Sequence, residues 1–403
     1  MKTILGILLV VTAGAAATEM PELDHLWTDG LYSTITAPHC TGGVAPKNAK
    51  RLKLHVPGFK KGLCIRAVVQ EHPASLVVIL NGTFGKAGDA ATNLWMAWLE
   101  ANGWHVLTFD STFHYTFTSA AQIGVAGNLE VEAEAAGQVI QAFLERPEVS
   151  GKVTRIGVVG MSYGGIQALN LARLSKLGRL PFHLDVVQVY SAPVSMWSAM
   201  GILDHGFGFH KGIPQLAWDF CLLKREWPVK TQYAPQDMRL ALSRVFRLDL
   251  QNVVETNDRL FDKDLAAGGC PRLDIPKEDP AAGIGSGERV GYAAAVNFQT
   301  YFKRVVVPYW VAKGRARNAE DILRLGELSV LLRETGGNVR VILAANDPLN
   351  EEGAVERLRA DVGGAKLTVL PRGGHLGFVN AEWTRTSLRG LFGVGSAVDV
   401  AKR

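Results

Sequence analysis

The chain has 403 residues, of which 47% are hydrophobic and 20% are charged, and its formal net charge is +5. This composition is ordinary for a globular protein and supplies enough apolar material for one large core or two smaller ones. The charged residues are spread along the chain, without a basic arm or a basic stripe interleaved with aromatic residues. The sequence therefore argues against a nucleic-acid partner.

The first seventeen residues, MKTILGILLVVTAGAAA, have the pattern of a secretory signal peptide. One early lysine precedes an apolar run from Ile4 to Val11, and Ala15 and Ala17 form an A-x-A cleavage site. An uncleaved membrane anchor is the alternative, but the apolar run is short for a bilayer span. No later segment is long and apolar enough to cross a membrane. We therefore expect a secreted or periplasmic protein whose mature chain has no transmembrane segment.

Cleavage at this site predicts that the exported protein begins at Thr18. N-terminal sequencing of the protein recovered outside the cytoplasm of an expressing cell checks this expectation. A mature protein that still begins at Met1 would contradict the interpretation of residues 1–17 as a cleaved signal.

Four cysteines fit an oxidising compartment: Cys40, Cys64, Cys221 and Cys270. Four cysteines allow three connectivities, and sequence proximity favours the pairs Cys40–Cys64 and Cys221–Cys270. Four buried free thiols are the alternative. Neither pair has the short spacing of metal ligands, so the sequence predicts disulfides and no zinc site.

After a polar lead, strand-like and helix-like segments alternate along the chain. The run at 75–82, SLVVILNG, is nearly continuous in apolar residues, which is typical of a strand that is buried on both faces. Apolar residues recur at helical spacing after Asn128, which is a suitable N-cap residue. Strands are expected at 51–56, 63–70, 75–82, 104–110, 153–160 and 184–193, and helices at 91–103, 129–143 and 166–177. Short links between alternating elements predict a parallel sheet covered by helices.

The alternation stops between about 194 and 311, a segment rich in aromatic residues, and then resumes. A helix is expected at about 319–333, a strand at 338–347, a helix from 351, a strand at 365–371 and a last helix from 380. Because both flanks belong to one sheet, we interpret 194–311 as an inserted cap rather than a separate module. The predicted organisation is a signal at 1–17, a first core part at 18–193, the cap at 194–311 and a second core part at 312–403.

Ser162 stands in the only G-x-S-x-G of the chain, Gly160-Met161-Ser162-Tyr163-Gly164. The motif is weak alone, but here it follows a strand-like run and opens a helix, which is the context of a nucleophile elbow. Side chains two positions away on either side would clash in such a turn, so glycine is needed there. The alternative is a glycine-rich turn in which Ser162 is an ordinary N-cap.

A serine nucleophile needs a base, and the base needs an acid to orient it. Of ten histidines, only His375 lies in a short loop directly after a late strand; His205 and His210 are the rivals. Asp347 ends the strand before that one. Glu351 and Glu352 are fallback acids. With one strand–helix–strand unit between them, Asp347 and His375 are expected at the same edge of the sheet.

This strand–elbow–helix arrangement and the order Ser162, Asp347, His375 resemble those of the α/β-hydrolases, over about 51–392 apart from the insertion. The resemblance implies an eight-stranded, mostly parallel sheet flanked by helices. It also implies a helical cap inserted after the sixth strand, which is where 194–311 falls.

The resemblance further implies that main-chain amides hold an oxyanion. The first is assigned to Met161, taken as the residue just after the nucleophile. The second comes from the loop after the third strand, where many relatives carry His-Gly and this chain reads Asn81-Gly82-Thr83-Phe84-Gly85. Thr83 is favoured as the donor, with Phe84 in reserve. A plain turn is the other interpretation, since Asn-Gly is a strong turn former.

These residues predict an exported serine hydrolase that cleaves a carboxylic ester or related acyl bond in a small-molecule acyl or peptide substrate, without a metal or an organic cofactor. A peptidase for short or N-terminal peptides is the alternative; it needs an anionic group in the cap. A non-catalytic binding protein on the same scaffold is a third reading. Cap aromatics would favour an apolar acyl group unless they form the cap's own core. Candidates for the ammonium site are Asp204, Asp219 and Glu226, and candidates for the pocket wall are His114, Tyr115 and Phe117.

Overall fold

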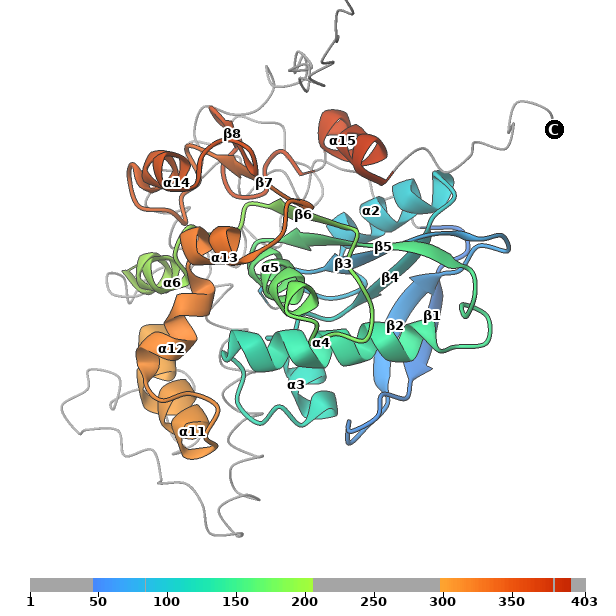
Figure 1. Cartoon of the computed structure of the whole chain (residues 1–403), viewed down its shortest axis with the longest axis horizontal. Coiled ribbons are helices and arrows are strands. Elements are labelled where there is room, and N and C mark those ends of the chain that lie inside the picture. The colour runs from blue at the N-terminus through green and yellow to red at the C-terminus, as the bar shows by residue number, and fades with distance from the viewer. Residues whose placement is uncertain (1–45, 84, 206–297, 380, 393–403) are drawn as a thin grey trace, which may run out of the picture.

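The computed structural model describes residues 46–83, 85–205, 298–379 and 381–392. They form one eight-stranded sheet in the order β1-β2-β4-β3-β5-β6-β7-β8, with helices packed on it (Figure 1). This confirms the predicted eight-stranded, mostly parallel sheet. The strands are β1 (Lys50–Leu54), β2 (Leu63–Val68), β3 (Ala74–Leu80), β4 (His105–Phe109), β5 (Val153–Met161), β6 (Val186–Tyr190), β7 (Val339–Ala344) and β8 (Leu367–Leu370).

The sheet is parallel from β4 to β8, while β1 pairs antiparallel with β2 and β2 pairs antiparallel with β4. In register, Gly160 of β5 lies between Leu80 of β3 and Val189 of β6. The carboxyl ends of β3, β5, β6, β7 and β8 therefore meet at one edge. In open α/β sheets this edge is where ligands bind.

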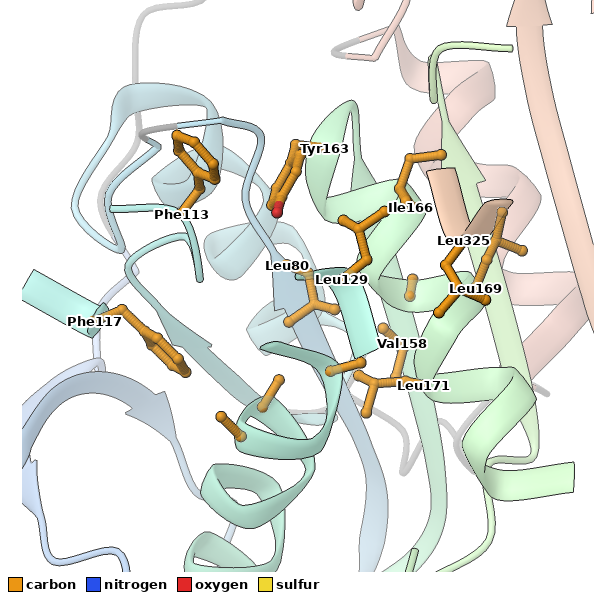
Figure 2. Packing of buried hydrophobic residues seen from close by; sticks show 14 of the residues in the cluster. Leu80, Phe113, Phe117, Leu129, Val158, Tyr163, Ile166, Leu169, Leu171 and Leu325 are labelled. Carbon is orange, nitrogen blue, oxygen red and sulfur yellow. The ribbon is translucent and has the colours of Figure 1, made fainter. Parts of the chain in front are cut away.

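Both faces of the sheet are buried, and β3 shows why. Its side chains alternate between two apolar cores: Leu76, Val78 and Leu80 belong to one, and Val77 and Ile79 to the other. A strand covered on both faces reads as a continuous apolar run, as 75–80 does. The first core contains α4 (Leu129–Leu144) and α5 (Tyr163–Lys176), and the second contains α2 (Ala90–Ala101) and α15 (Glu382–Phe392) (Figures 1 and 2).

Helix starts follow the capping residues of the sequence where these are present. The Asn128 side chain accepts a hydrogen bond of 3.2 Å from the amide of Val131, so α4 begins where predicted. One helix, α3 (Tyr115–Ala121), was not predicted; the side chain of His114 caps it by accepting from the amide of Thr116. Seven residues are too few to show a clear helical period in the sequence.

The connection from β6 to β7 is long, and its described ends are helical. They are α6 (Met196–His205), α10 (Phe298–Tyr301), a π-helical turn (Phe302–Val306), α11 (Val307–Ala312), α12 (Ala319–Leu323), a 3₁₀ turn (Arg324–Gly326) and α13 (Leu328–Glu334). A long connection thus follows the sixth strand, where the cap was expected. Most of the predicted cap lies outside the described residues, so its architecture stays a prediction.

The prediction of a single helix at 319–333 is wrong, because the segment is divided into α12, the 3₁₀ turn and α13. The break contains Gly326, which packs closely on Met196 of α6: a Cβ placed on Gly326 would lie 2.8 Å from the Cβ of Met196. This tertiary contact overrides the helical period of the sequence. Farther along, α14 (Ala354–Val362) fills the connection between β7 and β8.

The predicted signal at 1–17 lies outside the described residues, as do Cys40, Cys221 and Cys270. Cys64 is an exposed free thiol on β2. The pairing Cys40–Cys64 therefore stays a prediction, and so does Cys221–Cys270. Within the described ranges, no helix has the length and apolar character of a membrane span.

Candidate active site

Ser162 sits in a sharp turn between β5 and α5. Its backbone has φ 54° and ψ −121°, a conformation that is strained for a residue with a side chain. Hydrogen bonds on both sides hold the turn: the Ser162 amide donates to the Tyr190 carbonyl at 2.9 Å, and the Ser162 carbonyl accepts from the Gly165 amide at 2.8 Å. The Ser162 side chain makes no capping bond to α5. The structure thus contradicts the N-cap interpretation and leaves the hydroxyl available for another partner.

The flanking glycines are required by close backbone contacts. A Cβ on Gly160 would collide with the carbonyl oxygen of Gly164, and a Cβ on Gly164 would collide with the carbonyl oxygen of Leu80. Backbone atoms cannot move aside as a flexible side chain can. The two elbow glycines are therefore needed for the steric reason that the sequence predicted.

His375 and Asp347 meet Ser162 at the carboxyl edge of the sheet. The Nε2 atom of His375 lies 2.8 Å from the Ser162 Oγ, and its Nδ1 atom lies 2.9 Å from Oδ2 of Asp347. All three residues are buried, with 3 to 7% of their surfaces exposed. The structure thus brings together the three residues that the sequence singled out, in a continuous chain of hydrogen bonds.

Neighbouring groups hold the acid and the base in position. The second oxygen of Asp347, Oδ1, accepts from the Leu349 amide at 2.9 Å, which fixes the carboxylate plane. The backbone on each side of His375 is also tied down. The Gly374 amide donates to Oδ1 of Asn346 at 2.9 Å, and the Leu376 amide donates to Oγ of Ser191 at 3.0 Å.

Asn346 and Ser191 were not predicted. Ser191 directly follows β6, and Asn346 lies two residues after β7, at the same edge of the sheet as Asp347 and Ser162. This position after a strand is the feature of the sequence that indicates them. The fallback acids Glu351 and Glu352 are exposed beyond this edge. Of the rival histidines, His205 ends α6 and His210 lies outside the described residues.

The assignment of the first oxyanion amide to Met161 is wrong. Met161 precedes Ser162 and is the last residue of β5, in register with Tyr190 of β6. An amide within a parallel ladder faces a neighbouring strand. Tyr163 follows Ser162 and opens α5, and the first amides of a helix have no partner within it. The Tyr163 amide is therefore the better candidate on this side of the hydroxyl.

The loop after β3 lies directly against the serine. A Cβ on Gly82 would be 3.3 Å from the Cβ of Ser162 and 3.8 Å from its Oγ, and Thr83 lines the same pocket as Ser162. Phe84, the reserve donor, lies outside the described residues. Thr83 therefore shares a pocket with Ser162, and its role as second oxyanion donor stays a prediction.

Asn81 does more than form a turn. Its buried amide nitrogen donates to the Phe109 carbonyl at 2.8 Å and to Oγ1 of Thr108 at 3.1 Å. Its amide oxygen accepts from Oγ1 of Thr92 at 2.6 Å. These bonds tie the loop after β3 to the end of β4 and to α2, which explains why asparagine suits this position.

A pocket of about 770 Å³, counting the part open to solvent, lies over Ser162 between the sheet edge and the helices of the β6–β7 connection. Its walls are almost entirely apolar, and no charged side chain is among the described residues that line it. They are Thr83, Phe113, Gly127, Leu129, Ser162, Tyr163, Pro193, Met196, Ala199, Met200, Leu203, Phe298, Tyr301, Phe302, Val306, Ile322, Leu323, Gly326 and Leu349.

Two of the three candidates for the pocket wall, His114 and Phe117, are not among the described residues that line it, and the Tyr115 side chain lies outside what the structure describes. Phe113 lines the pocket, whereas Phe117 is fully buried against Phe59 and Phe109, and His114 is used as the cap of α3. No described cluster of three or more histidine, cysteine, aspartate or glutamate side chains has the arrangement of a metal site.

Comparison with known proteins agrees with this architecture. The model of the alpha/beta hydrolase family matches residues 77–386, most of the chain. No curated protein sequence matches it significantly.

Among solved structures, the chain is similar to an esterase of Pyrococcus furiosus, with 12% identity, 87% of this chain and 97% of the other covered, and a TM-score of 0.43. It is also similar to a thermostable carboxyl esterase of Bacillus coagulans, with 13% identity, coverage of 86% and 96%, and a TM-score of 0.41. An acylaminoacyl peptidase of Pyrococcus horikoshii has 11% identity, coverage of 85% and 40%, and a TM-score of 0.45. Identities this low say nothing about a shared substrate, but the family match spans both halves of the sheet and all three residues of the hydrogen-bonded chain. The protein belongs to the alpha/beta hydrolase family.

Proposed function

We propose that the protein is an exported serine hydrolase that cleaves carboxylic esters of apolar acids through an acyl-enzyme intermediate. The observation that carries the proposal is the buried hydrogen-bonded chain Ser162–His375–Asp347, whose serine lines an apolar pocket. A serine hydroxyl becomes a nucleophile when an adjacent imidazole accepts its proton. Export rests on the signal-like residues 1–17.

In the first half-reaction, the Ser162 Oγ attacks the ester carbonyl as its proton passes to Nε2 of His375. Asp347 accepts from Nδ1 and stabilises the imidazolium that forms. The tetrahedral intermediate collapses when the bond to the alkoxy group breaks and His375 returns the proton to the departing alcohol. In the second half-reaction a water molecule gives one proton to His375 while its oxygen bonds to the acyl carbon. The bond between the acyl carbon and Ser162 Oγ then breaks as His375 passes that proton to Oγ, which releases the acid and restores Ser162.

Negative charge that develops on the carbonyl oxygen would be held by main-chain amides. We assign this role to the Tyr163 amide at the start of α5 and to the Thr83 amide, because Thr83, Ser162 and Tyr163 line the same pocket. Donors already in place for the developing charge contribute most in a site that excludes water, and the helix N-terminus adds a favourable dipole.

The pocket favours an ester over a peptide with a free N-terminus. An aminopeptidase must bind an ammonium group, and no carboxylate is among the described residues that line the pocket. Asp204 is engaged elsewhere: its carboxylate accepts from the amides of Phe298 and Gln299 at 2.8 and 2.9 Å. Asp219 and Glu226 lie outside the described residues. The described walls offer apolar contacts to an acyl chain, and they offer no carboxylate to an ammonium group.

Paired assays on p-nitrophenyl esters and aminoacyl p-nitroanilides test this proposal. We expect kcat/KM to rise with acyl length from acetate, about tenfold for each two methylenes that enter the pocket, because each buried methylene contributes about 0.8 kcal/mol. The aminoacyl anilides should turn over at least a hundredfold more slowly. Faster cleavage of the anilides would favour the peptidase. Absence of any turnover, with no labelling by a fluorophosphonate, would favour a binding protein.

A further inference from the structure

A second carboxylate, outside the hydrogen-bonded chain, is buried directly behind the nucleophile. Glu132 of α4 has no exposed surface, and none of the described ion pairs includes it. Instead it accepts four hydrogen bonds. Its Oε2 accepts from Oγ1 of Thr112 at 2.6 Å, from the Tyr163 hydroxyl at 2.7 Å and from Nε2 of Gln167 at 2.8 Å, and its Oε1 accepts from the Gly127 amide at 2.6 Å.

A carboxylate without a cation is an expensive group to bury, and it persists only if its hydrogen bonds are complete. Burial raises the pKa of Glu132, while the four donors act in the opposite direction. Burial and the neighbouring Glu132 also raise the pKa of Tyr163 well above its usual value, so the Tyr163 hydroxyl keeps its proton and donates it. An apolar residue would fill this place without the cost of desolvating a carboxylate, so packing alone does not explain why a glutamate is here.

The donors come from three segments that surround the elbow. Thr112 follows β4, Gly127 precedes α4, and Tyr163 and Gln167 are in the first turns of α5. Glu132 therefore joins the loop beyond β4, the start of α4 and the helix that carries the nucleophile at its N-terminus. These are also the segments that contribute Phe113, Gly127 and Tyr163 to the pocket.

Tyr163 is the residue through which Glu132 reaches the site. It is bonded directly to Ser162, whose backbone is strained and must be held by its surroundings. At its far end the Tyr163 hydroxyl is tied to Glu132, and its ring packs edge-on against Phe113 with centroids 5.4 Å apart (Figure 2). A residue held both at the ring and at the hydroxyl has little freedom to shift its backbone, and the Tyr163 amide directly follows the strained Ser162.

We propose that Glu132 is a positioning residue that, by binding the Tyr163 hydroxyl, fixes the Tyr163 amide as an oxyanion donor. This inference rests on the proposed ester hydrolase. Glu132 touches no reacting atom; it acts through Tyr163. The amide is needed most when charge develops on the carbonyl oxygen, so its misplacement should affect kcat far more than KM.

The chain offers a matched pair of variants for the test. Tyr163→Phe and Thr112→Val each remove one hydroxyl that donates to the same oxygen, Oε2 of Glu132, over nearly the same distance. Both leave Glu132 one donor short, so both should lower the melting temperature by a similar amount. Only Tyr163→Phe releases the residue that carries the candidate amide. Glu132→Ala is a poorer test, because losing the centre of the network could unfold the protein.

Steady-state kinetics on a p-nitrophenyl ester, together with melting temperatures, decide the matter. We expect Tyr163→Phe to lower kcat by about ten- to a hundredfold with KM within about twofold of wild type, since small displacements of catalytic groups cost up to about 10² in rate. Thr112→Val should keep kcat within about threefold of wild type. Equal kcat values in the two variants, at equal melting temperatures, would overturn this inference and leave the ester hydrolase standing. A wild-type protein without ester turnover would overturn both.

Discussion

Replacing Ser162 with alanine should abolish ester turnover and leave the fold intact. The change removes only the hydroxyl, while the elbow glycines, the hydrogen bonds of the turn and both apolar cores stay. We expect kcat to fall by about 10⁶-fold, leaving at most the 10³–10⁴-fold advantage over water that binding and oxyanion donors supply in known triads. Turnover of p-nitrophenyl esters, measured beside a thermal melt, checks this.

Ser195→Ala is the matched control for Ser162→Ala. The Ser195 hydroxyl donates to Oε1 of Glu327 at 2.6 Å, and neither residue is among those that line the apolar pocket, so its loss should leave ester turnover near wild type. The melting temperature of Ser162→Ala should equal or slightly exceed that of wild type, because residues held in strained active-site conformations often cost stability. If Ser162→Ala turns over esters as fast as Ser195→Ala, the nucleophile lies elsewhere.

Replacing Asp347 with asparagine should lower kcat by about 10⁴-fold without unfolding the protein. The carboxylate oxygen that faces Nδ1 of His375 at 2.9 Å holds the imidazole in the tautomer whose Nε2 can accept the serine proton. An amide nitrogen at this place stabilises the opposite tautomer, with the proton on Nε2. Steady-state kinetics and circular dichroism of the same preparation separate this effect from misfolding.

Glu351→Gln provides the comparison for Asp347→Asn. Glu351 is exposed, and its Oε2 lies 3.8 Å from Nη2 of Arg357. An exposed ion pair of this kind should contribute little to stability or activity. Its variant should retain wild-type kcat. If Glu351→Gln were inactive and Asp347→Asn active, the acid would be misassigned, however close Asp347 lies to the imidazole.

Much of this architecture follows from local patterns in the sequence. The strand at 74–80 was visible because a strand covered on both faces is apolar throughout, and the start of α4 was visible because Asn128 caps it. Asp347 and His375 could be placed together because parallel strands end at one edge, which turns separation along the chain into proximity in space. Apolar patterns thus indicated the individual strands, the G-x-S-x-G motif indicated Ser162, and strand ends indicated Asp347 and His375, while the eight-stranded sheet came from the resemblance to the α/β-hydrolases.

What the sequence missed depends on contacts between distant segments. The break in the helix at 319–333 comes from the packing of Gly326 on Met196, more than a hundred residues away. Glu132 was not singled out, because nothing in the sequence around it indicates the four hydrogen-bond donors that surround it in the structure. The donors arrive from separate loops and from α5, so they become apparent only when the fold is assembled.

The misassignment of the oxyanion donor has a different origin. Met161 and Tyr163 both adjoin Ser162, and the difference between them is which side of the elbow each occupies. Met161 ends a strand and Tyr163 begins a helix, and only the latter leaves its amide without a partner in its own element. The sheet register agrees with this, because Met161 is still within the ladder, opposite Tyr190.

Site mapping of a fluorophosphonate adduct tests the central claim most directly. The reagent bonds to a serine only when a neighbouring base activates it, so it reports the function of the buried hydrogen-bonded chain and not merely its shape. Wild-type protein is treated with the probe and digested, and the modified residue is identified by tandem mass spectrometry. We predict a single adduct on Ser162, absent from Ser162→Ala and formed much more slowly in Asp347→Asn. An adduct on another residue, or undiminished labelling of Ser162→Ala, would contradict the assignment of Ser162 as the nucleophile.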